Sequence, residues 1–219
     1  MHGYLADKNS FAYQTGYFSR YFTVHAIDLK GFGQNQGMEY PYSLSDYANE
    51  VKDYISLNGL NRPHLIAHSF GVRIAVKLAS ETPDLFDKIV ITGGAGLKPK
   101  RSIKYRLKRL AFKTVKFFNP SAKLERFYSA DYLALNPVMR QSFIKIVNEH
   151  LDDRLKFIRN ETLLVYGELD KETPLYMAKR FNRGIKNSKL ITIKNAGHFP
   201  FIDCPYKFNT EVREFLLSN

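Results

Sequence analysis

The chain has 219 residues, 44% of them hydrophobic and 25% charged, which fits one globular domain with a sizeable core. Its only cysteine, Cys204, excludes an internal disulfide and a cysteine-rich metal site, and no apolar run is long enough to cross a bilayer. The net charge of +12 favours an anionic partner such as nucleic acid, a membrane surface, an acidic protein or an acidic substrate. Because the N-terminus lacks the pattern of a signal peptide, we expect a cytoplasmic protein.

The first quarter of the chain predicts a helix, a strand and a second helix. Aromatic residues recur at helical spacing over residues 9–21, and residues 21–27 form an apolar stretch typical of a strand. Gly31 and Gly33 follow it without the third glycine of a dinucleotide-binding loop, so we reject that site. A helix over residues 43–57 opens with a capping box.

Ser69 stands where a short buried strand meets a helix. Residues 65–67 are apolar and follow a proline, whereas residues 72–79 carry apolar side chains at helical spacing. We expect the small residues Ala67 and Gly71 to let strand and helix approach closely, as in the nucleophile elbow G-x-S-x-G, with alanine replacing the first glycine. A serine at such a junction can also be only an N-cap.

Strands and helices alternate in the rest of the chain. Short apolar runs predict strands at residues 88–92, 162–166 and 189–193. Helical patterns cover residues 174–181 and 206–217. This alternation implies an α/β protein with a mostly parallel sheet.

A long insertion without strand signals separates two parts of this α/β core. We expect the core to comprise residues 1–96 and 159–219, and residues 97–158 to form a helical cap over the carboxyl edge of the sheet. Within the cap, residues 98–119 predict an amphipathic helix that is rich in lysine and arginine and has no acidic residue. This helix could be a solvated lid, dock on an anionic lipid surface or recruit an acidic carrier protein. Nucleic acid is not the expected partner, because no binding motif is present.

Three candidate catalytic side chains follow the carboxyl ends of predicted strands. Ser69, Asp170 and His198 each occupy such a position, and parallel strands gather these ends at one edge of the sheet. In such a set the histidine takes the serine proton and later returns it, while the aspartate fixes the imidazole tautomer. The backbone N–H groups of Phe70 and Tyr4 are the expected donors to the oxyanion that develops on the substrate.

Other interpretations of these side chains remain open. Asp170 could be an ordinary cap before a helix, and His198 a loop histidine. Glu168 or Asp203 could supply the acid in its place, although Asp170 fits better. The remaining histidines considered are expected to be structural or to lie on the surface: His25, His64, His68 and His150.

With these motifs in order, the chain resembles the α/β-hydrolase superfamily. The matching segments are His2–Tyr4, Asp28–Gly33, Ala67–Gly71, Gly167–Asp170 and Gly197–Pro200. The resemblance implies an α/β-hydrolase fold with a lid, in the branch that contains esterases, lipases, thioesterases and carbon–carbon bond hydrolases. It implies a serine hydrolase that cleaves a small carboxylic ester or related acyl substrate through an acyl-enzyme on Ser69, with no metal or organic cofactor.

One departure from the family favours a different function. In the family three strands precede the His-Gly turn, and this sequence shows none of them before His2. We expect a misassigned start, a truncation or a remnant, in which two central strands lose a partner and the Tyr4 N–H loses its anchor. The alternative is therefore a catalytically impaired or non-catalytic protein that binds a ligand or an anionic partner through its basic cap.

Overall fold

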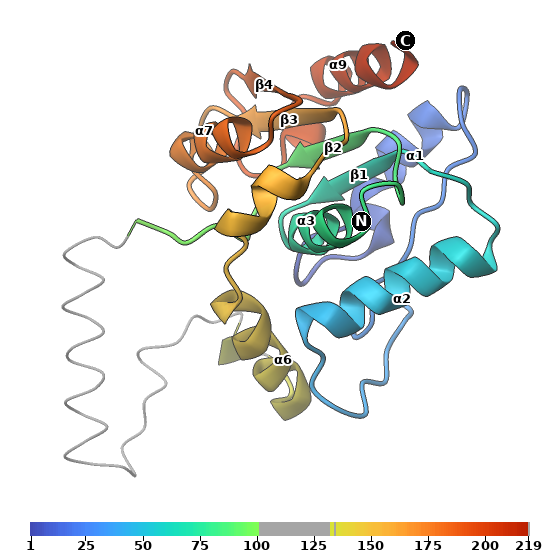
Figure 1. The fold of residues 1–219 in the computed structure, drawn as a ribbon, viewed down its shortest axis with the longest axis vertical. Helices are drawn as coiled ribbons and strands as arrows, with labels where there is room; N and C mark the ends of the chain where they lie inside the picture. Colours follow the sequence, from blue (N-terminus) through green and yellow to red (C-terminus); the bar gives the residue numbers. More distant parts are fainter. Residues whose placement is uncertain (101–131, 134, 219) are drawn as a thin grey trace.

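A parallel sheet forms the centre of the molecule (Figure 1). The structure is a computed structural model that describes residues 1–100, 132, 133 and 135–218. In the described part, four strands pair in the order β1-β2-β3-β4, and every pair is parallel. These strands are β1 (Leu65–His68), β2 (Ile89–Thr92), β3 (Thr162–Gly167) and β4 (Ser188–Ile193). The predicted parallel α/β sheet is confirmed.

Helices connect these strands and flank them. The helices of the described residues are η1 (Lys8–Phe11), α1 (Ala12–Phe18), α2 (Leu44–Leu57), α3 (Phe70–Glu81), α6 (Pro137–Asn148), η3 (Asp152–Phe157), α7 (Leu175–Gly184), α8 (Pro200–Asp203) and α9 (Pro205–Leu217). The predicted helices at 43–57, 174–181 and 206–217 agree with α2, α7 and α9 to within a few residues.

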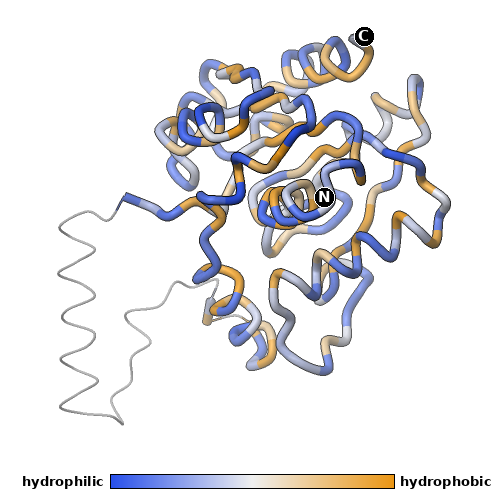
Figure 2. The backbone as a smooth tube through the Cα atoms, viewed as in Figure 1, coloured by the Kyte–Doolittle hydropathy of each residue, from blue (hydrophilic) through white to orange (hydrophobic). Residues whose placement is uncertain are grey.

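Alternate residues of the strands pack in two separate hydrophobic cores. Ile91 and Leu164 pack in the core that contains α2, α3 and α7, whereas Val90 and Val165 pack in the core that contains α1 and α9. Because successive side chains of a strand point to opposite faces, the sheet is covered by helices on both sides. Figure 2 shows hydrophobic residues along the central strands and alternating with hydrophilic ones along α2.

The start of α2 has the capping box that the sequence predicts. The Asp46 N–H donates to Ser43 Oγ at 3.3 Å, and Asp46 Oδ2 accepts from the Ser43 N–H at 2.7 Å. Two backbone donors that a helix start would leave unpaired are therefore satisfied.

The predicted strand over residues 21–27 is wrong. Tyr21 and Phe22 instead form the turn that ends α1, and residues 23–27 have no regular secondary structure, so β1 is left as an edge strand of the described sheet. Phe22 and Val24 are only half-buried, because a groove separates this segment from β1. An apolar stretch is not sufficient for a strand, because a strand also needs a partner within hydrogen-bond distance.

The predicted cap region 97–158 is only partly described. Its described part is mainly helical and contains α6 and η3. Arg73 on α3 ties α6 to the core, because its Nη1 donates to the carbonyl oxygens of Ile146 and Glu149, both at 2.8 Å. Most of the predicted basic helix 98–119 lies outside the described residues, so this helix and the cap boundaries stay predictions. Among the described helices, none combines the length and apolarity needed to span a membrane.

Candidate active site

Ser69 occupies a strained turn between β1 and α3. Its backbone has φ 47° and ψ −105°, a conformation that L-residues rarely adopt and that costs on the order of 1–3 kcal/mol. The turn is fixed against the end of β2, because the Ser69 N–H donates to Thr92 O at 3.1 Å and Ser69 O accepts from the Ala95 N–H at 3.3 Å. The strand–turn–helix arrangement predicted for the elbow is therefore present.

Gly71 is needed for a different contact from the one that the sequence suggests. A Cβ at this position would lie 2.8 Å from Met1 O and 2.9 Å from His2 O. The Gly71 N–H donates to His2 O at 3.1 Å, and the His68 N–H donates to Met1 O at 3.0 Å. The missing side chain thus lets the first residues of the chain lie directly on the elbow, rather than letting the strand approach the helix.

His2 holds the turn that carries the expected oxyanion donor. Its Nε2 accepts from the Leu29 N–H at 3.0 Å, so Nδ1 carries the proton and donates to Gly3 O at 2.7 Å. Burial lowers the pKa of His2, which favours this neutral form. In the described residues, the N–H groups of Tyr4 and Phe70 have no hydrogen-bond acceptor, so both are available to a substrate oxyanion.

The structure brings Asp170 and His198 together. Asp170 Oδ2 lies 3.0 Å from His198 Nδ1. The same carboxylate accepts from Thr173 Oγ1 at 2.7 Å and from the N–H groups of Glu172 and Thr173, both at 2.9 Å. Burial alone would raise the pKa of Asp170, but the hydrogen bonds from His198 and Thr173 outweigh it and lower the pKa. The carboxylate is therefore charged and suited to orienting an imidazole.

Thr173 was missed by the sequence analysis. Its hydroxyl contacts Asp170 and also lies 3.4 Å from His198 Nδ1. The sequence does suggest that Asp170 contacts this residue, since an aspartate often accepts from the N–H groups two and three residues further on. Without the fold, such a turn says nothing about catalysis.

The two alternative acids bind the loop that carries His198 rather than its imidazole. Asp203 Oδ2 accepts from the Gly197 N–H at 2.7 Å, and Glu168 Oε2 accepts from the Asn195 N–H at 3.4 Å. Asp203 is followed by the half-exposed Cys204, which lies between α8 and α9. The loop is therefore held at two residues that precede His198.

His68 links the elbow to the same loop. Its side chain is 1% exposed, its Nε2 donates to His198 O at 3.0 Å, and the two imidazole centroids are 4.7 Å apart. Burial lowers the pKa of His68 to about 3, so the ring is neutral. The predicted structural role agrees with these contacts, although the sequence could not show that His68 touches His198.

Ser69 and His198 lie in the same region without a direct hydrogen bond between them in the described structure. They are connected through His68, the neighbour of Ser69, and through Gly93, where a Cβ would lie 3.0 Å from His198 Cε1. Nucleophile–base hydrogen bonds are often long before substrate binds. No group of three or more possible metal ligands occurs within the part of the chain that the structure describes.

A parallel α/β sheet with a strained serine elbow and an Asp–His pair at its carboxyl edge defines the α/β hydrolases. The model of the alpha/beta hydrolase family matches residues 1–211, and the chain belongs to this family.

Several relatives and solved structures resemble the chain along most of its length. It is 25% identical to AB hydrolase superfamily protein YisY of Bacillus subtilis, over 98% of this chain and 89% of that protein. It is also 25% identical to pimeloyl-[acyl-carrier protein] methyl ester esterase of Wigglesworthia glossinidia brevipalpis, over 90% and 85%. An esterase from Exiguobacterium antarcticum superposes with a TM-score of 0.79 at 23% identity, covering 100% of this chain and 90% of that one. The α/β-hydrolase fold is thereby confirmed.

Proposed function

We propose that the protein is a serine hydrolase that cleaves a carboxylic ester or a related acyl compound through an acyl-enzyme on Ser69. The observation that carries this proposal is the Asp170–His198 pair, 3.0 Å apart, beside a serine held at positive φ. A structural histidine would need no buried carboxylate with three further hydrogen bonds behind it.

The arrangement supports a two-step mechanism. His198 Nε2 takes the Ser69 proton as Oγ attacks the carbonyl carbon, and Asp170 stabilises the imidazolium that forms. The N–H groups of Tyr4 and Phe70 stabilise the oxyanion, at roughly 3 kcal/mol for each donor. His198 then protonates the leaving alcohol, and water repeats the sequence to release the acid.

The ester class is supported by the names of one relative and one structural neighbour. One relative is named a methyl ester esterase and one structural neighbour an esterase, whereas another neighbour is a meta-cleavage product hydrolase from Pseudomonas fluorescens IP01. An acidic carrier protein or an anionic lipid surface, contacted through the basic residues 98–119, remains the proposed partner. Hydrolysis of p-nitrophenyl esters of increasing acyl length, compared with a carbon–carbon bond substrate, separates these classes.

A fluorophosphonate probe tests the nucleophile directly. We expect wild-type protein to be labelled, Ser69→Ala to lose the label and Ser80→Ala to keep it. Ser80 lies on α3, the helix that follows the elbow, and its hydroxyl bonds only the Lys77 carbonyl in the described structure. If folded wild-type protein is not labelled, the hydrolase proposal fails and the non-catalytic alternative gains support.

A further inference from the structure

A glycine turn, residues 93–95, follows β2 and lies between the proposed nucleophile and the proposed base. On one side, the carbonyl oxygen of the last residue of β2 accepts from the Ser69 N–H at 3.1 Å, and the Ala95 N–H donates to Ser69 O at 3.3 Å. On the other side, a Cβ on Gly93 would lie 3.0 Å from His198 Cε1 and 3.1 Å from its Nδ1. The position of this turn therefore sets the spacing between the two side chains.

Strand pairing does not hold the glycine turn. The pairing of β2 with β3 ends at Thr92 and Val165, although β3 itself continues to Gly167. Gly93 has φ 52°, so the chain leaves the extended conformation directly after the strand. Gly94 is buried, and its N–H therefore needs an acceptor that the sheet does not provide.

The hydroxyl of Tyr166 supplies that acceptor. The Gly94 N–H donates to Tyr166 Oη at 3.0 Å, and the hydroxyl in turn donates to Gly94 O at 3.5 Å. Within the part of the chain that the structure describes, this N–H has no other acceptor. A Cβ on Gly94 would lie 2.5 Å from the same oxygen, so the hydroxyl contacts the backbone of the turn directly. Burial raises the pKa of Tyr166, which keeps the hydroxyl neutral.

Packing of the core does not by itself require this hydroxyl. The Tyr166 side chain is fully buried in the core that contains α3 and α7, where a phenylalanine ring would fill the same space. The hydroxyl adds only the bonds to Gly94. Tyr166 also lies on β3, the strand whose carboxyl end leads to Asp170. It therefore joins the strand that precedes the proposed acid to the turn between Ser69 and His198.

We propose that Tyr166 is a positioning residue, whose hydroxyl fixes the glycine turn and thereby the spacing between Ser69 and His198. This inference rests on the proposed function, because it concerns how a serine and a histidine are held for proton transfer. His198 must come within hydrogen-bond distance of Ser69 Oγ when substrate binds. A misplacement of about 1 Å at a reacting group lowers the rate by roughly 100-fold, so a turn that cannot shift favours catalysis.

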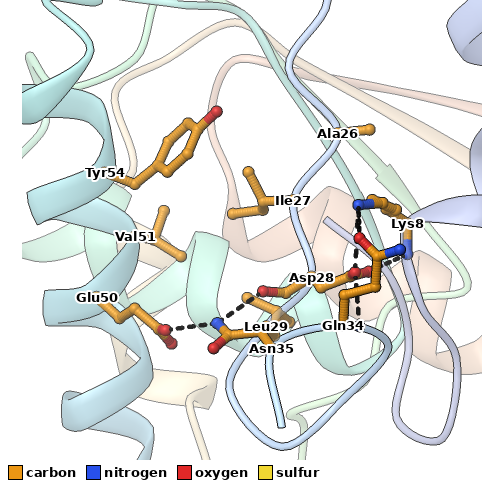
Figure 3. A pocket seen from close by; sticks show the side chains of 10 residues that line it. All are labelled: Lys8, Ala26, Ile27, Asp28, Leu29, Gln34, Asn35, Glu50, Val51 and Tyr54. Carbon is orange, nitrogen blue, oxygen red and sulfur yellow. Dashed lines mark hydrogen bonds and ion pairs between the residues drawn. The ribbon is translucent and has the colours of Figure 1, made fainter.

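The oxyanion side of the site has separate supports. Asp28 lines the pocket shown in Figure 3, and its carboxylate accepts from the Lys8 N–H at 2.7 Å. Its backbone carbonyl accepts from Asn35 Nδ2 at 3.0 Å. These bonds fix the segment that follows Tyr4 without involving Tyr166. A change at Tyr166 should therefore leave the expected Tyr4 donor in place.

Tyr166→Phe tests the proposal, because it removes the hydroxyl and keeps the ring. We expect kcat for a p-nitrophenyl ester to fall by roughly 10- to 100-fold while KM changes by less than about twofold, since the reacting groups are misplaced but substrate contacts are kept. Fluorophosphonate labelling of Ser69 should slow by a similar factor. The matched control is Thr162→Val at the other end of β3, where a buried hydroxyl donates to Asn160 O at 3.0 Å. This control should keep the kcat and the labelling rate of wild type.

Amide hydrogen exchange reports on the turn without any activity measurement. In Tyr166→Phe, exchange of the Ala95 amide should become faster by on the order of tenfold or more, because the turn is no longer fixed to β3. The Lys8 amide is the internal reference and should exchange as in wild type, as should both amides in Thr162→Val. Gly94→Ala is a second variant, in which the new methyl group displaces the hydroxyl, and it should give the same pattern as Tyr166→Phe.

Several results would overturn the inference. Wild-type kcat in Tyr166→Phe, or an equal loss of kcat in Thr162→Val, would show that the hydroxyl does not position the reacting pair. A raised KM with unchanged kcat would assign the residue to substrate binding instead. Unchanged exchange of the Ala95 amide would show that the hydroxyl does not hold the turn. If wild-type protein neither hydrolyses esters nor takes the label, the proposed function fails, and the Ala95 exchange still decides whether the hydroxyl holds the turn.

Discussion

Substitution of Gly167 by alanine should displace the loop that carries His198. A Cβ at this position would lie 2.6 Å from the Ala196 carbonyl carbon and closer still to the carbonyl oxygens of Ala196 and Gly197. Two carbon atoms need roughly 3.5 Å, so the loop must move by about 1 Å. All of these contacts are with backbone, which cannot rotate away as a side chain can.

The expected effects follow from that displacement. Such overpacking costs about 1–3 kcal/mol, which lowers the Tm of a domain of this size by about 3–10 °C. A misplacement of about 1 Å at a reacting group lowers kcat by roughly 100-fold. Differential scanning calorimetry and p-nitrophenyl ester hydrolysis measure the two effects.

Gly16 in α1 is the matched control. A Cβ there meets nothing within 4 Å, so Gly16→Ala should keep kcat and stabilise the protein by up to about 1 kcal/mol through helix propensity. If Gly167→Ala melts and hydrolyses like wild type, the packing argument is refuted. A lower Tm with unchanged kcat would show that the loop yields without moving His198.

Three further predictions concern single side chains. Asp170→Asn should lower kcat by about 10⁴-fold with an unchanged circular dichroism spectrum, because an amide favours the wrong imidazole tautomer; retained activity would exclude the residue as the triad acid. His68 has a pKa of about 3 in the folded protein, whereas its ordinary value is 6.5, so the unfolded chain binds an additional proton between these two pH values. The free energy of unfolding therefore falls as the pH drops from 6.5 towards 3. His68→Gln, which keeps a donor for His198 O, should make the free energy of unfolding less dependent on pH, by up to about 1.4 kcal/mol per pH unit. Urea titrations of both proteins at pH 7 and pH 5 measure this dependence, and an equal change in wild type and variant would contradict the prediction. Ser43→Ala should cost about 1 kcal/mol in the same titrations, and no loss would mean that the capping box of α2 does not stabilise the helix.

The sequence predicts those features that depend on local pattern. The capping box at Ser43, the elbow at Ser69 and the four parallel strands follow from spacing and side-chain type, and the structure has them. The pairing of Asp170 with His198 depends on two loops meeting at adjacent strand ends. The order of the strands made that meeting foreseeable.

What the sequence could not show depends on contacts between distant backbone segments. Residues 21–27 have a strand pattern, but the absence of a neighbouring strand in the described sheet is a property of the whole arrangement. The contact of Gly71 with Met1 O and the support of Asp170 by Thr173 are likewise invisible in composition or periodicity.

The thiol of Cys204 can be labelled to follow the motion of the loop that carries His198. Cys204 is the only cysteine in the sequence and is half-exposed, one residue after the aspartate that binds the Gly197 N–H. A maleimide fluorophore would therefore attach at one place without any engineering of the chain. Its emission would report how the histidine-bearing loop responds when an inhibitor or an acyl group arrives.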